Sequence, residues 1–593
     1  MTATAFGPPT TALPSLPDVL RLRGRTRPDD IAYVFLRDGE HPDQSLTYRQ
    51  LDDTARSLAA VLHSRGLRGS AVVLLFPSGL EFVSTLLACM SAGVAGAPVQ
   101  VPTRRGGLTR LRRIADDAGT STVLTTAAVK QDLERRFGDT PELAGLTLVD
   151  VGSLERPPAG EWTGPEVGPD DIALLQYTSG STGNPKGVRV THANFRANVA
   201  ETDQLWPCRP DSAVVNWLPL FHDMGMLFGV VLPLWAGIPA YLMAPESFIR
   251  RPARWLEAIS RFRGSHTAAP SFAYELCVRD ATGNGTSDGL DLSSLRVAAN
   301  GAEPVRWTTV RAFAETFAAA GFRSRAMCPG YGLAENTLKV TGSPEDREPT
   351  VLRLSAEALR EGRVEHAPDS PADILGHVVD AVGCGTTVGA TAVRIADPGT
   401  TAALPDHTVG EIWVNGPCVA DGYHGRPEEN AETFGARLAG AEDRGTWLRT
   451  GDLGFVHAGE LFVTGRLKDV IIRKGRNHYP QDIEVSAESA DAALRPNCAA
   501  AFSVDDGSAE RLVLVVEADG RALRDGGPVG LRERVRDAVL DGQRLAPDEI
   551  LLVRRGALPK TSSGKVQRRE TRRRYLEGEF GPRTVTVARA ATR

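Results

Sequence analysis

Short apolar segments that end in polar loops constrain the fold of this chain most. Residues 71–76 (AVVLLF) are typical of a buried strand, residues 81–90 of a helix and residues 97–101 of a second strand. Before them, Thr47 followed by Gln50 forms a capping box that predicts the start of an amphipathic helix. Because strands that alternate with helices usually pair in parallel, this order predicts βαβ units and an α/β fold.

The same rhythm returns downstream, where three further strands are each followed by a polar loop. They are predicted at residues 172–176, 213–218 and 295–299. Parallel α/β sheets bind their ligands at the carboxyl ends of the strands. We therefore expect the three loops to contribute to one composite site.

The chain is too long for a single hydrophobic core, since 593 residues correspond to several domains of ordinary size. After residue 340, Gly, Pro and Thr become denser and short β-branched runs occur at 392–395 and 411–414, which predicts a small β-rich subdomain. From about residue 468 a further unit begins, with a strand at 512–516 and a helix near 531–540.

Composition excludes some function classes. Lys and Arg total 68 against 73 Asp and Glu, a net charge of −5, which argues against a general nucleic-acid-binding surface. The seven cysteines are scattered singly without a CxxC pair, which argues against a disulfide framework and a structural zinc site and favours the reducing cytoplasm.

One segment is long enough to suggest a membrane span. Residues 224–245 contain 22 residues without a charge. Helix breakers interrupt it, however, at Gly229, Pro233, Gly237 and Pro239. We expect a buried helix that leads into a buried strand, and no membrane span.

The strongest local motif is YTSGSTGNPKGV at residues 177–188, directly after a predicted strand. Its glycines allow tight turns, its hydroxyls donate hydrogen bonds and Lys186 adds a positive charge, a combination that suits an oligophosphate. Asn184 and Pro185 precede the lysine, so the motif is not the Walker A loop of kinases and GTPases.

At this loop the chain resembles the adenylate-forming superfamily of acyl-CoA synthetases, peptide-synthetase adenylation domains and luciferases. Five more motifs of that superfamily follow in the expected order: NGAE at 300–303, YGLAE at 331–335, TGD at 450–452, GRLKD at 465–469 and PKTSSGK at 559–565. The resemblance implies a large N-terminal region, residues 1–466, with two α/β subdomains and the β-rich subdomain. It also implies a small mobile α+β C-terminal domain, residues 467–593, which swings about Lys468.

The resemblance also assigns roles to residues. Tyr331 would stack on adenine, Asp452 would bind the ribose hydroxyls and Glu335, with Ser181, would hold Mg²⁺. Lys565, His222 and Glu335 would be catalytic, with Lys560 as the competitor for the lysine role. The implied ATP-binding set is Thr178, Ser179, Gly180, Ser181, Thr182, Gly183, Lys186, Gly301, Ala302, Glu303, Tyr331, Gly332, Asp452 and Arg466.

The acyl side of the site would follow the strand at 213–218. Amino-acid-activating relatives carry Asp one residue after the aromatic of this segment, whereas His222 stands there in LPLFHDMG, so amino-acid activation is disfavoured. The implied acyl pocket contains His222, Asp223, Met224, Gly225 and Phe272. The other apolar residues of this region could equally belong to the core.

The segments HDMG at 222–225, 248–260, 269–277 and 465–484 resemble one branch, the fatty acyl-AMP ligases. This resemblance implies an enzyme that uses ATP and Mg²⁺ to convert a fatty acid into its acyl-adenylate. It would then load the acyl group on a separate holo acyl carrier protein, for polyketide or lipopeptide biosynthesis. The alternatives are a fatty acyl-CoA synthetase that uses free coenzyme A and a catalytically silent adenylate-binding scaffold.

Two further segments leave alternatives open, and two residues depart from the superfamily pattern. Residues 351–369, with Ser355 as N-cap and Gly362 as helix stop, either form the branch's extra segment that restrains the C-terminal domain or an ordinary surface loop. The segment 554–593 carries a net charge of +9 and either docks an acidic carrier protein or forms a solvated helix. Gly330 and Asn336 depart from the superfamily pattern beside the expected adenylate.

Overall fold

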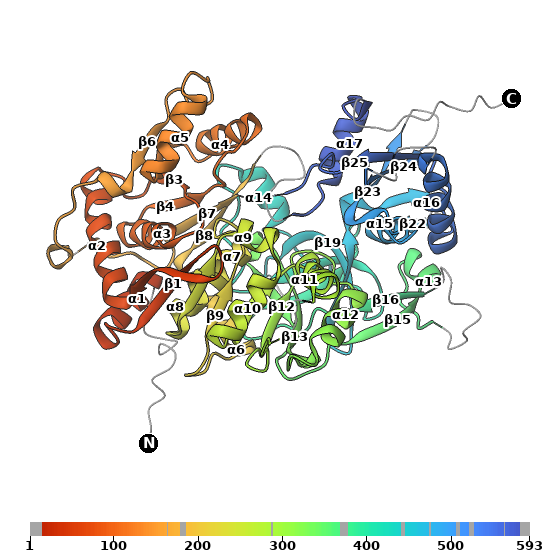
Figure 1. The fold of residues 1–593 in the computed structure, drawn as a ribbon, viewed down its shortest axis with the longest axis horizontal. Helices are drawn as coiled ribbons and strands as arrows, with labels where there is room; N and C mark the ends of the chain where they lie inside the picture. Colours follow the sequence, from red (N-terminus) through yellow and green to blue (C-terminus); the bar gives the residue numbers. More distant parts are fainter. Residues whose placement is uncertain are drawn as a thin grey trace.

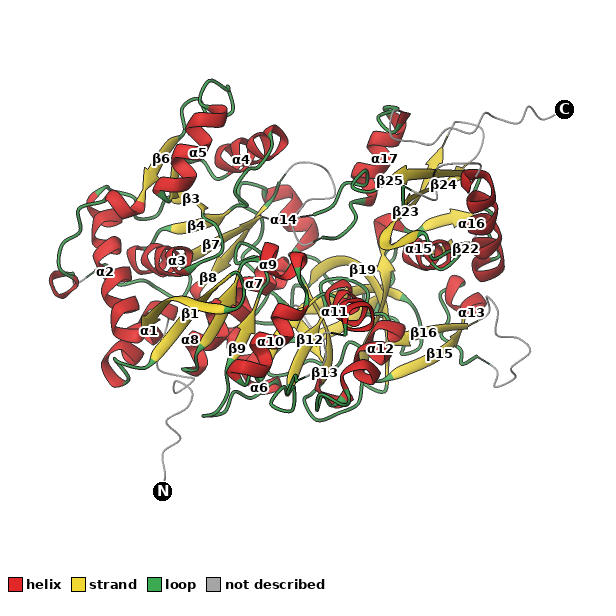
Figure 2. Cartoon of the chain, viewed as in Figure 1, coloured by secondary structure: helices red, strands yellow, loops and turns green. Residues whose placement is uncertain are grey.

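The computed structural model of the chain describes residues 15–162, 164–177, 185–285, 289–367, 378–440, 445–473, 476–505, 510–520, 523, 527–561 and 564–581. Figure 1 shows the two large α/β sheets in the red-to-green part of the chain and a C-terminal unit, in blue, to one side. Helices cover the strands of both large sheets (Figure 2), as the α/β prediction requires.

The first sheet has six strands in the order β6-β5-β3-β4-β7-β8, all parallel except the last pair. The predicted capping box is present, because Thr47 and Gln50 exchange hydrogen bonds at the start of α2. The strand predicted at 97–101 begins earlier, at Ala95, since the small residues of β4 pack closely against β3. The strands are β3 (Ala71–Leu75), β4 (Ala95–Pro98), β5 (Thr122–Thr125), β6 (Thr147–Asp150), β7 (Ile172–Tyr177) and β8 (Gly187–Thr191), and the helices α2 (Tyr48–Ser64), α3 (Leu80–Ala92), α4 (Arg105–Asp117) and α5 (Ala127–Phe137).

The second sheet has eight strands in the order β14-β13-β12-β11-β9-β10-β1-β2, parallel from β13 to β1 with an antiparallel strand at each edge. Its strands are β1 (Ile31–Arg37), β2 (His41–Thr47), β9 (Val214–Asn216), β10 (Ala240–Met243), β11 (His266–Ala269), β12 (Val297–Asn300), β13 (Met327–Gly332) and β14 (Lys339–Gly342). The associated helices are α1 (Leu16–Thr26), α6 (His192–Leu205), α9 (Pro245–Arg250), α10 (Ala253–Phe262), α11 (Ser271–Asn284) and α12 (Trp307–Phe317).

The charge-free segment folds as predicted, into a buried helix followed by a buried strand. It forms α7 (Asp223–Met226), a π-helical turn η3 (Leu227–Val231) and α8 (Leu232–Ala236), and then β10. Its apolar side chains lie in the main core. Among the described residues, no helix is long and apolar enough to cross a membrane.

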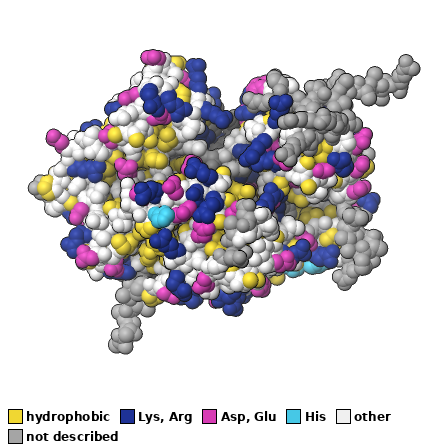
Figure 3. Space-filling model, in the orientation of Figure 1, with side chains coloured by type: hydrophobic (Ala, Val, Ile, Leu, Met, Phe, Trp, Pro, Cys, Tyr) yellow, Lys and Arg dark blue, Asp and Glu magenta, His cyan; other side chains and the backbone are white. Residues whose placement is uncertain are grey.

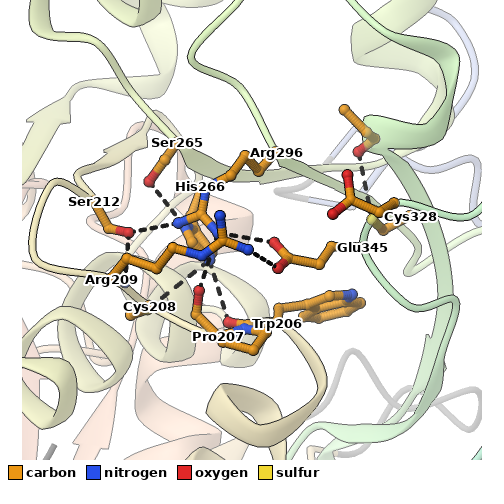
Figure 4. A network of polar contacts seen from close by, with 12 residues as sticks. Trp206, Pro207, Cys208, Arg209, Ser212, Ser265, His266, Arg296, Cys328 and Glu345 are labelled. Atoms are coloured by element: carbon orange, nitrogen blue, oxygen red, sulfur yellow. Dashed lines mark hydrogen bonds and ion pairs between the residues drawn. The ribbon is translucent and has the colours of Figure 1, made fainter. Parts of the chain in front are cut away.

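A polar network lies at the amino ends of β9, β11 and β12, away from the strand ends that carry the predicted site (Figure 4). Glu345 accepts hydrogen bonds from Arg209 at 2.5 Å and from Arg296 at 2.9 Å. Beside them, His266 contacts the Trp206 carbonyl at 3.2 Å. Burial lowers the pKa of His266 to about 3, so the imidazole is neutral near pH 7. Together, these contacts link the amino ends of the three strands.

The predicted β-rich subdomain is an antiparallel sheet in the order β17-β18-β19-β20 with an antiparallel strand pair, β15-β16, beside it. The predicted runs at 392–395 and 411–414 lie within β17 and β18. The elements are β15 (Val351–Ser355), α13 (Ala356–Arg360), β16 (Val378–Val382), β17 (Ala392–Ala396), β18 (Gly410–Asn415), α14 (Pro427–Thr433), β19 (Leu448–His457) and β20 (Glu460–Arg466).

The C-terminal unit has its own core around the sheet β23-β24-β25. The predicted strand at 512–516 lies in β24 and the predicted helix at 531–540 in α16. The elements are β21 (Ile471–Arg473), β22 (Arg476–His478), α15 (Pro480–Glu488), β23 (Leu494–Asp505), β24 (Glu510–Ala518), α16 (Gly527–Gln543), β25 (Glu549–Arg554) and α17 (Arg568–Leu576).

The C-terminal unit rests on α11 and on the loop before α12 through polar contacts. Asn497 donates to Glu275 at 2.7 Å, and Arg306 lies 3.4 Å from Glu488. On the face of the molecule that Figure 3 shows, acidic and basic side chains are interspersed outside the grey regions, which agrees with the near-neutral net charge.

Candidate active site

Lys565 lies between β25 and α17 in a loop whose residues 562 and 563 are outside the described part of the chain, and hydrogen bonds join Thr561 to Gly564 and Lys565. The backbone N–H of Gly564 donates to the Thr561 carbonyl at 2.9 Å, and the N–H of Lys565 donates to the Thr561 hydroxyl at 3.0 Å. Gly564 has φ +87°, and a Cβ atom there would lie 3.2 Å from the Phe272 ring. Gly564 therefore packs the lysine loop against Phe272, at the start of α11, where the acyl pocket was predicted.

Two carboxylates oppose the effect of burial on Lys565. Burial lowers the pKa of the Lys565 ammonium, and the negative charges of Glu303 and Asp223 favour its protonated form. Glu303 itself accepts the Phe272 backbone N–H at 2.7 Å, and burial raises the pKa of its carboxyl. The predicted catalytic lysine, adenine-side loop and acyl segment thus come together in this structure.

The acyl segment is fixed by short polar contacts at the start of α7. His222 Nδ1 lies 2.5 Å from Asp223 Oδ1, which also accepts the Met224 N–H at 2.7 Å. A Cβ atom on Gly225 would lie 2.1 Å from the Pro219 carbonyl oxygen, so only glycine fits there. Gly225 therefore shapes the backbone that presents His222 and Asp223.

An aromatic cluster that the sequence did not single out as pocket residues lies beside Phe272. Trp217 follows β9 directly, stacks on Phe248 with ring centroids 4.0 Å apart and meets Phe272 edge-on at 6.2 Å. The position of Trp217 at the carboxyl end of a predicted strand was the signal that could have identified it. This cluster gives the acyl segment an apolar wall.

The residues predicted to bind the nucleoside also converge. The Tyr331 hydroxyl donates to Asp452 Oδ2 at 2.8 Å, and Arg466 Nε donates to Asp452 Oδ1 at 3.0 Å. Tyr331 lies on β13, whereas Asp452 and Arg466 are register partners on β19 and β20. Gly301 and Gly332 permit close backbone approach beside them, because a Cβ atom would lie 2.7 Å from the Gly330 oxygen and 2.1 Å from the Leu338 oxygen, respectively. Ala302, between Gly301 and Glu303, has φ +66°.

Glu335 lies on the short 3₁₀ turn η5 (Ala334–Asn336) that follows β13. Its Oε1 accepts the Tyr423 hydroxyl at 2.8 Å, and burial raises the pKa of its carboxyl, so the group is short of compensating positive charge. A Mg²⁺ ion held by this carboxylate and by phosphate oxygens would supply that charge, which fits the predicted metal role. Tyr423, which sequence reasoning missed, comes from the distant loop after β18.

Most of the predicted phosphate loop, including Thr178, Ser179, Gly180, Ser181, Thr182 and Gly183, lies outside the described residues. Lys186 is described: its ammonium pairs with Glu429 of α14 and lies 5.0 Å from the centroid of the Tyr423 ring. At the other end of the loop, the Tyr177 hydroxyl donates to Asp117 at 2.9 Å. Nothing in the local sequence of Asp117 or Glu429 pointed to these contacts.

The predicted hinge residue Lys468 lies in a 3₁₀ turn, η7 (Leu467–Asp469), between β20 and the C-terminal unit. Helix α13 begins at the predicted N-cap, since Ser355 accepts the Ala358 N–H at 3.3 Å. Arg476 of the C-terminal unit lies 3.0 Å from Glu357 of α13, and Arg360 donates to Gln543 at 3.3 Å. The segment therefore contacts the C-terminal unit directly.

The basic α17 is largely neutralised by its own neighbourhood. Arg573 pairs with Glu570 at 2.7 Å and with Glu577, and Arg574 pairs with Glu570 at 2.8 Å. These pairs favour the solvated-helix alternative over a carrier-docking surface. Residues 582–593 lie outside the described part of the chain.

Comparison with known proteins decides the family. The AMP-binding enzyme family matches residues 20–424, more than half of the chain, and the AMP domain of Disco-interacting protein 2-like proteins matches residues 468–583. The chain belongs to the AMP-binding enzyme family. Within that family, fatty acyl-AMP ligases resemble this AMP-binding enzyme over nearly its whole length, which confirms the branch that the sequence motifs indicated.

The relatives of this AMP-binding enzyme include the medium-chain-fatty-acid acyl-carrier-protein ligase JamA of Moorena producens, 41% identical with 95% of each chain covered. The long-chain-fatty-acid AMP ligase FadD32 of Mycolicibacterium smegmatis is 35% identical, with 94% of this chain and 93% of FadD32 covered. Among solved structures, the fatty acyl-adenylate ligase of Legionella pneumophila in complex with acyl adenylate and pyrophosphate is 34% identical, with a TM-score of 0.75 and 98% and 99% of the two chains covered.

Proposed function

We propose that this AMP-binding enzyme activates a fatty acid with ATP to an acyl-adenylate and pyrophosphate. It then transfers the acyl group to the phosphopantetheine thiol of a separate acyl carrier protein. The observation that carries the proposal is that the loop of Lys565 packs with Gly564 against Phe272, while the Lys565 ammonium feels the negative charges of Glu303, Asp223 and Asp452, the last of which bonds Tyr331. Relatives named as fatty-acid ligases of acyl carrier proteins support the acceptor.

In the first step, an oxygen of the fatty acid carboxylate attacks the α-phosphorus of ATP, and the bond to pyrophosphate breaks. No general base is needed, because the carboxylate is ionised near neutral pH. Lys565 offsets the negative charge that develops on the α-phosphate oxygens. Glu335 and Ser181 would hold Mg²⁺, which would supply positive charge against the oligophosphate.

The remaining predicted residues bind and orient the substrates. Tyr331 and Asp452 hold the adenosine, while Lys186 and the 178–183 loop hold the pyrophosphate that leaves. His222, Asp223, Met224, Gly225 and Phe272 hold the acyl end. In the second step, the carrier thiol attacks the acyl carbonyl carbon and AMP leaves. The C-terminal domain, residues 467–593, changes orientation about Lys468 between the steps.

Intact-mass analysis of a holo carrier protein, incubated with the enzyme, ATP and a graded set of fatty acids, tests both steps. We expect a mass increase equal to one acyl group for a limited range of chain lengths. A parallel reaction with coenzyme A tests the alternative, since acylation of coenzyme A at least as fast as of the carrier would identify a fatty acyl-CoA synthetase. Absence of fatty-acid-dependent pyrophosphate exchange would identify a silent scaffold.

A further inference from the structure

Helix α6 carries a buried polar face that takes no part in the steps above. Asn194, Asn198 and Glu201 are 8%, 0% and 5% exposed, and their spacing places them on one side of the helix. A buried helix face is ordinarily apolar, and buried polar groups are kept only where they are hydrogen-bonded. The bonds that these side chains make therefore indicate what the face is for.

Asn198 binds the backbone on both sides of the turn that follows Glu335. Its Nδ2 donates to the carbonyl oxygens of Asn336 at 3.1 Å and of Lys339 at 2.9 Å. Its Oδ1 accepts the Lys339 N–H at 3.3 Å. One side chain thus joins the end of η5 to the start of β14.

The turn that Asn198 holds is strained. Thr337 has φ +63° and ψ −52°, and the Leu338 N–H donates to the Asn336 carbonyl at 2.6 Å, which together form a γ-turn of positive φ. A β-branched residue rarely adopts this conformation. The Thr337 hydroxyl donates to the Cys418 carbonyl at 2.8 Å, and the Asn336 side chain donates to the Lys339 carbonyl at 2.7 Å. Strained backbone of this kind persists where surrounding bonds enforce it, and it clusters at functional sites.

The same helix also holds a second backbone segment that reaches Glu335, the loop at residues 417–423 after β18. Asn194 Nδ2 donates to the carbonyl oxygens of Pro417 and Val419, both at 2.9 Å. Directly after them, the Ala420 N–H donates to the Glu335 carbonyl at 2.9 Å, and Tyr423 follows with its bond to the Glu335 carboxylate. The polar face of α6 therefore fixes both segments that position Glu335.

We propose that Asn198 and Thr337 are positioning residues for metal binding: Asn198 enforces the strained turn at Thr337, and that turn orients the Glu335 carboxylate toward the Mg²⁺ of MgATP. This inference rests on the proposed function. It also explains why Asn336 departs from the small residue expected there, since the Asn336 amide is part of the clamp. Residues that orient a metal ligand typically change metal affinity by about 10- to 100-fold when they are replaced.

Calorimetric titration of ATP into the full-length enzyme without fatty acid measures how much Mg²⁺ contributes to ATP affinity. Each protein is titrated once with Mg²⁺ present and once with EDTA, and the ratio of the two dissociation constants gives the affinity gained from Mg²⁺. For Asn198→Asp, which keeps the shape but loses both donors, we expect this gain to fall by at least about 10-fold. The dissociation constant in EDTA should stay within about twofold of the native value, because adenosine contacts are untouched.

Thr202→Val is the matched control on the same helix. Thr202 is fully buried and its hydroxyl bonds the Asn198 carbonyl at 2.7 Å, so the variant loses a buried hydrogen bond of α6 without touching the turn. Its Mg²⁺ gain should equal the native one. An unchanged gain in Asn198→Asp, or an equal loss in Thr202→Val, overturns the inference.

A second variant keeps the test decisive if Asn198→Asp fails to fold. Thr337→Val removes the bond to the Cys418 carbonyl and should show the same selective loss of the Mg²⁺ gain. Failure of the proposed function gives a different result, since the native enzyme would then form no acyl-adenylate at all. If the native enzyme forms acyl-adenylate and the variants keep the full affinity gain from Mg²⁺, the positioning role is wrong but the proposed function stands.

Discussion

At the scale of single residues, Lys565 is the group on which adenylate formation depends most. It lies between the acyl segment and the adenine-side loop, where Asp223 and Glu303 stabilise its positive charge. We predict that Lys565→Ala lowers the single-turnover rate of adenylate formation by about 10²- to 10³-fold or more, because one transition-state charge is lost. ATP affinity should change little. Lys560→Ala is the control, since the Lys560 ammonium donates to the Asn497 carbonyl at 2.9 Å.

The lowered pKa of Lys565 predicts a pH dependence. The protonated ammonium is the active form, so activity is lost as pH rises through a pKa that burial has brought below the ordinary value of 10.5. Single-turnover rates measured from about pH 7 to about pH 10 should therefore fall on the alkaline side. Lys565→Arg keeps its charge over this range and should move the fall to higher pH. If the rate fell at the same pH in both proteins, the fall would be due to the titration of a group other than Lys565.

The residues of the site show what sequence can and cannot reveal. Lys565, Tyr331, Glu335 and Asp452 lie in short motifs that resemble those of the adenylate-forming superfamily, so each could be proposed from its own segment. Tyr423 and Glu429 were not, because each acts through a contact with a residue more than 80 positions away in the chain. Such contacts depend on how strands of separate sheets come together, which no local pattern encodes.

At the scale of elements, helical and strand patterns predicted the location of several elements, among them β3, β7, β24 and α3. The 22-residue apolar segment turns from helix to strand at Gly237, whose positive φ of 73° ends α8, whereas Gly229 and Pro233, which were expected to divide it, lie inside the continuous helical stretch from α7 to α8. Strand ends were less predictable: β4 is displaced from the predicted run, since the small residues Ala95 and Gly96 join the sheet through backbone pairing with β3. Small side chains give little hydrophobic signal, yet they pack closely.

Helix α13 leads to a prediction about the acceptor. Its Glu357 pairs with Arg476 of the C-terminal unit, and the branch's extra segment is expected to restrain that unit. Glu357→Arg should raise the rate of coenzyme A acylation by about two- to fivefold, the modest effect of one exposed ion pair. The compensating double variant Glu357→Arg with Arg476→Glu should restore the native rate.

Glu365→Arg is the matched control for this helix, because Glu365 is exposed and pairs with Arg363. It should leave coenzyme A acylation unchanged. If Glu357→Arg and Glu365→Arg behaved alike, α13 would not restrain the C-terminal unit through this pair.

At the scale of the whole molecule, the structure shows the C-terminal unit in the orientation that seats Lys565 in the site. Cysteines introduced at Glu275 and Asn497, which are hydrogen-bonded across the interface, can be joined by a short thiol crosslinker. We predict that the crosslinked enzyme still forms acyl-adenylate but no longer loads the carrier, because the second step needs the other orientation. Six of the seven natural cysteines are buried, which keeps background crosslinking low.

A reducible crosslinker provides the internal control, since its cleavage should restore carrier loading in the same sample. Carrier loading at the native rate by the fully crosslinked protein would show that the two steps share one orientation. Mass spectrometry of the adenylate and of the carrier measures both outcomes side by side.

We expect the pairing of Lys186 with Glu429 to affect which anions the enzyme binds in the absence of ATP. The Glu429 carboxylate already forms an ion pair with the Lys186 ammonium. An orthophosphate ion would have to displace this carboxylate without help from any other contact. A triphosphate anchored elsewhere by its nucleoside competes at a high local concentration and displaces Glu429 more readily. We therefore expect Glu429 to compete more effectively against small inorganic anions than against nucleotides.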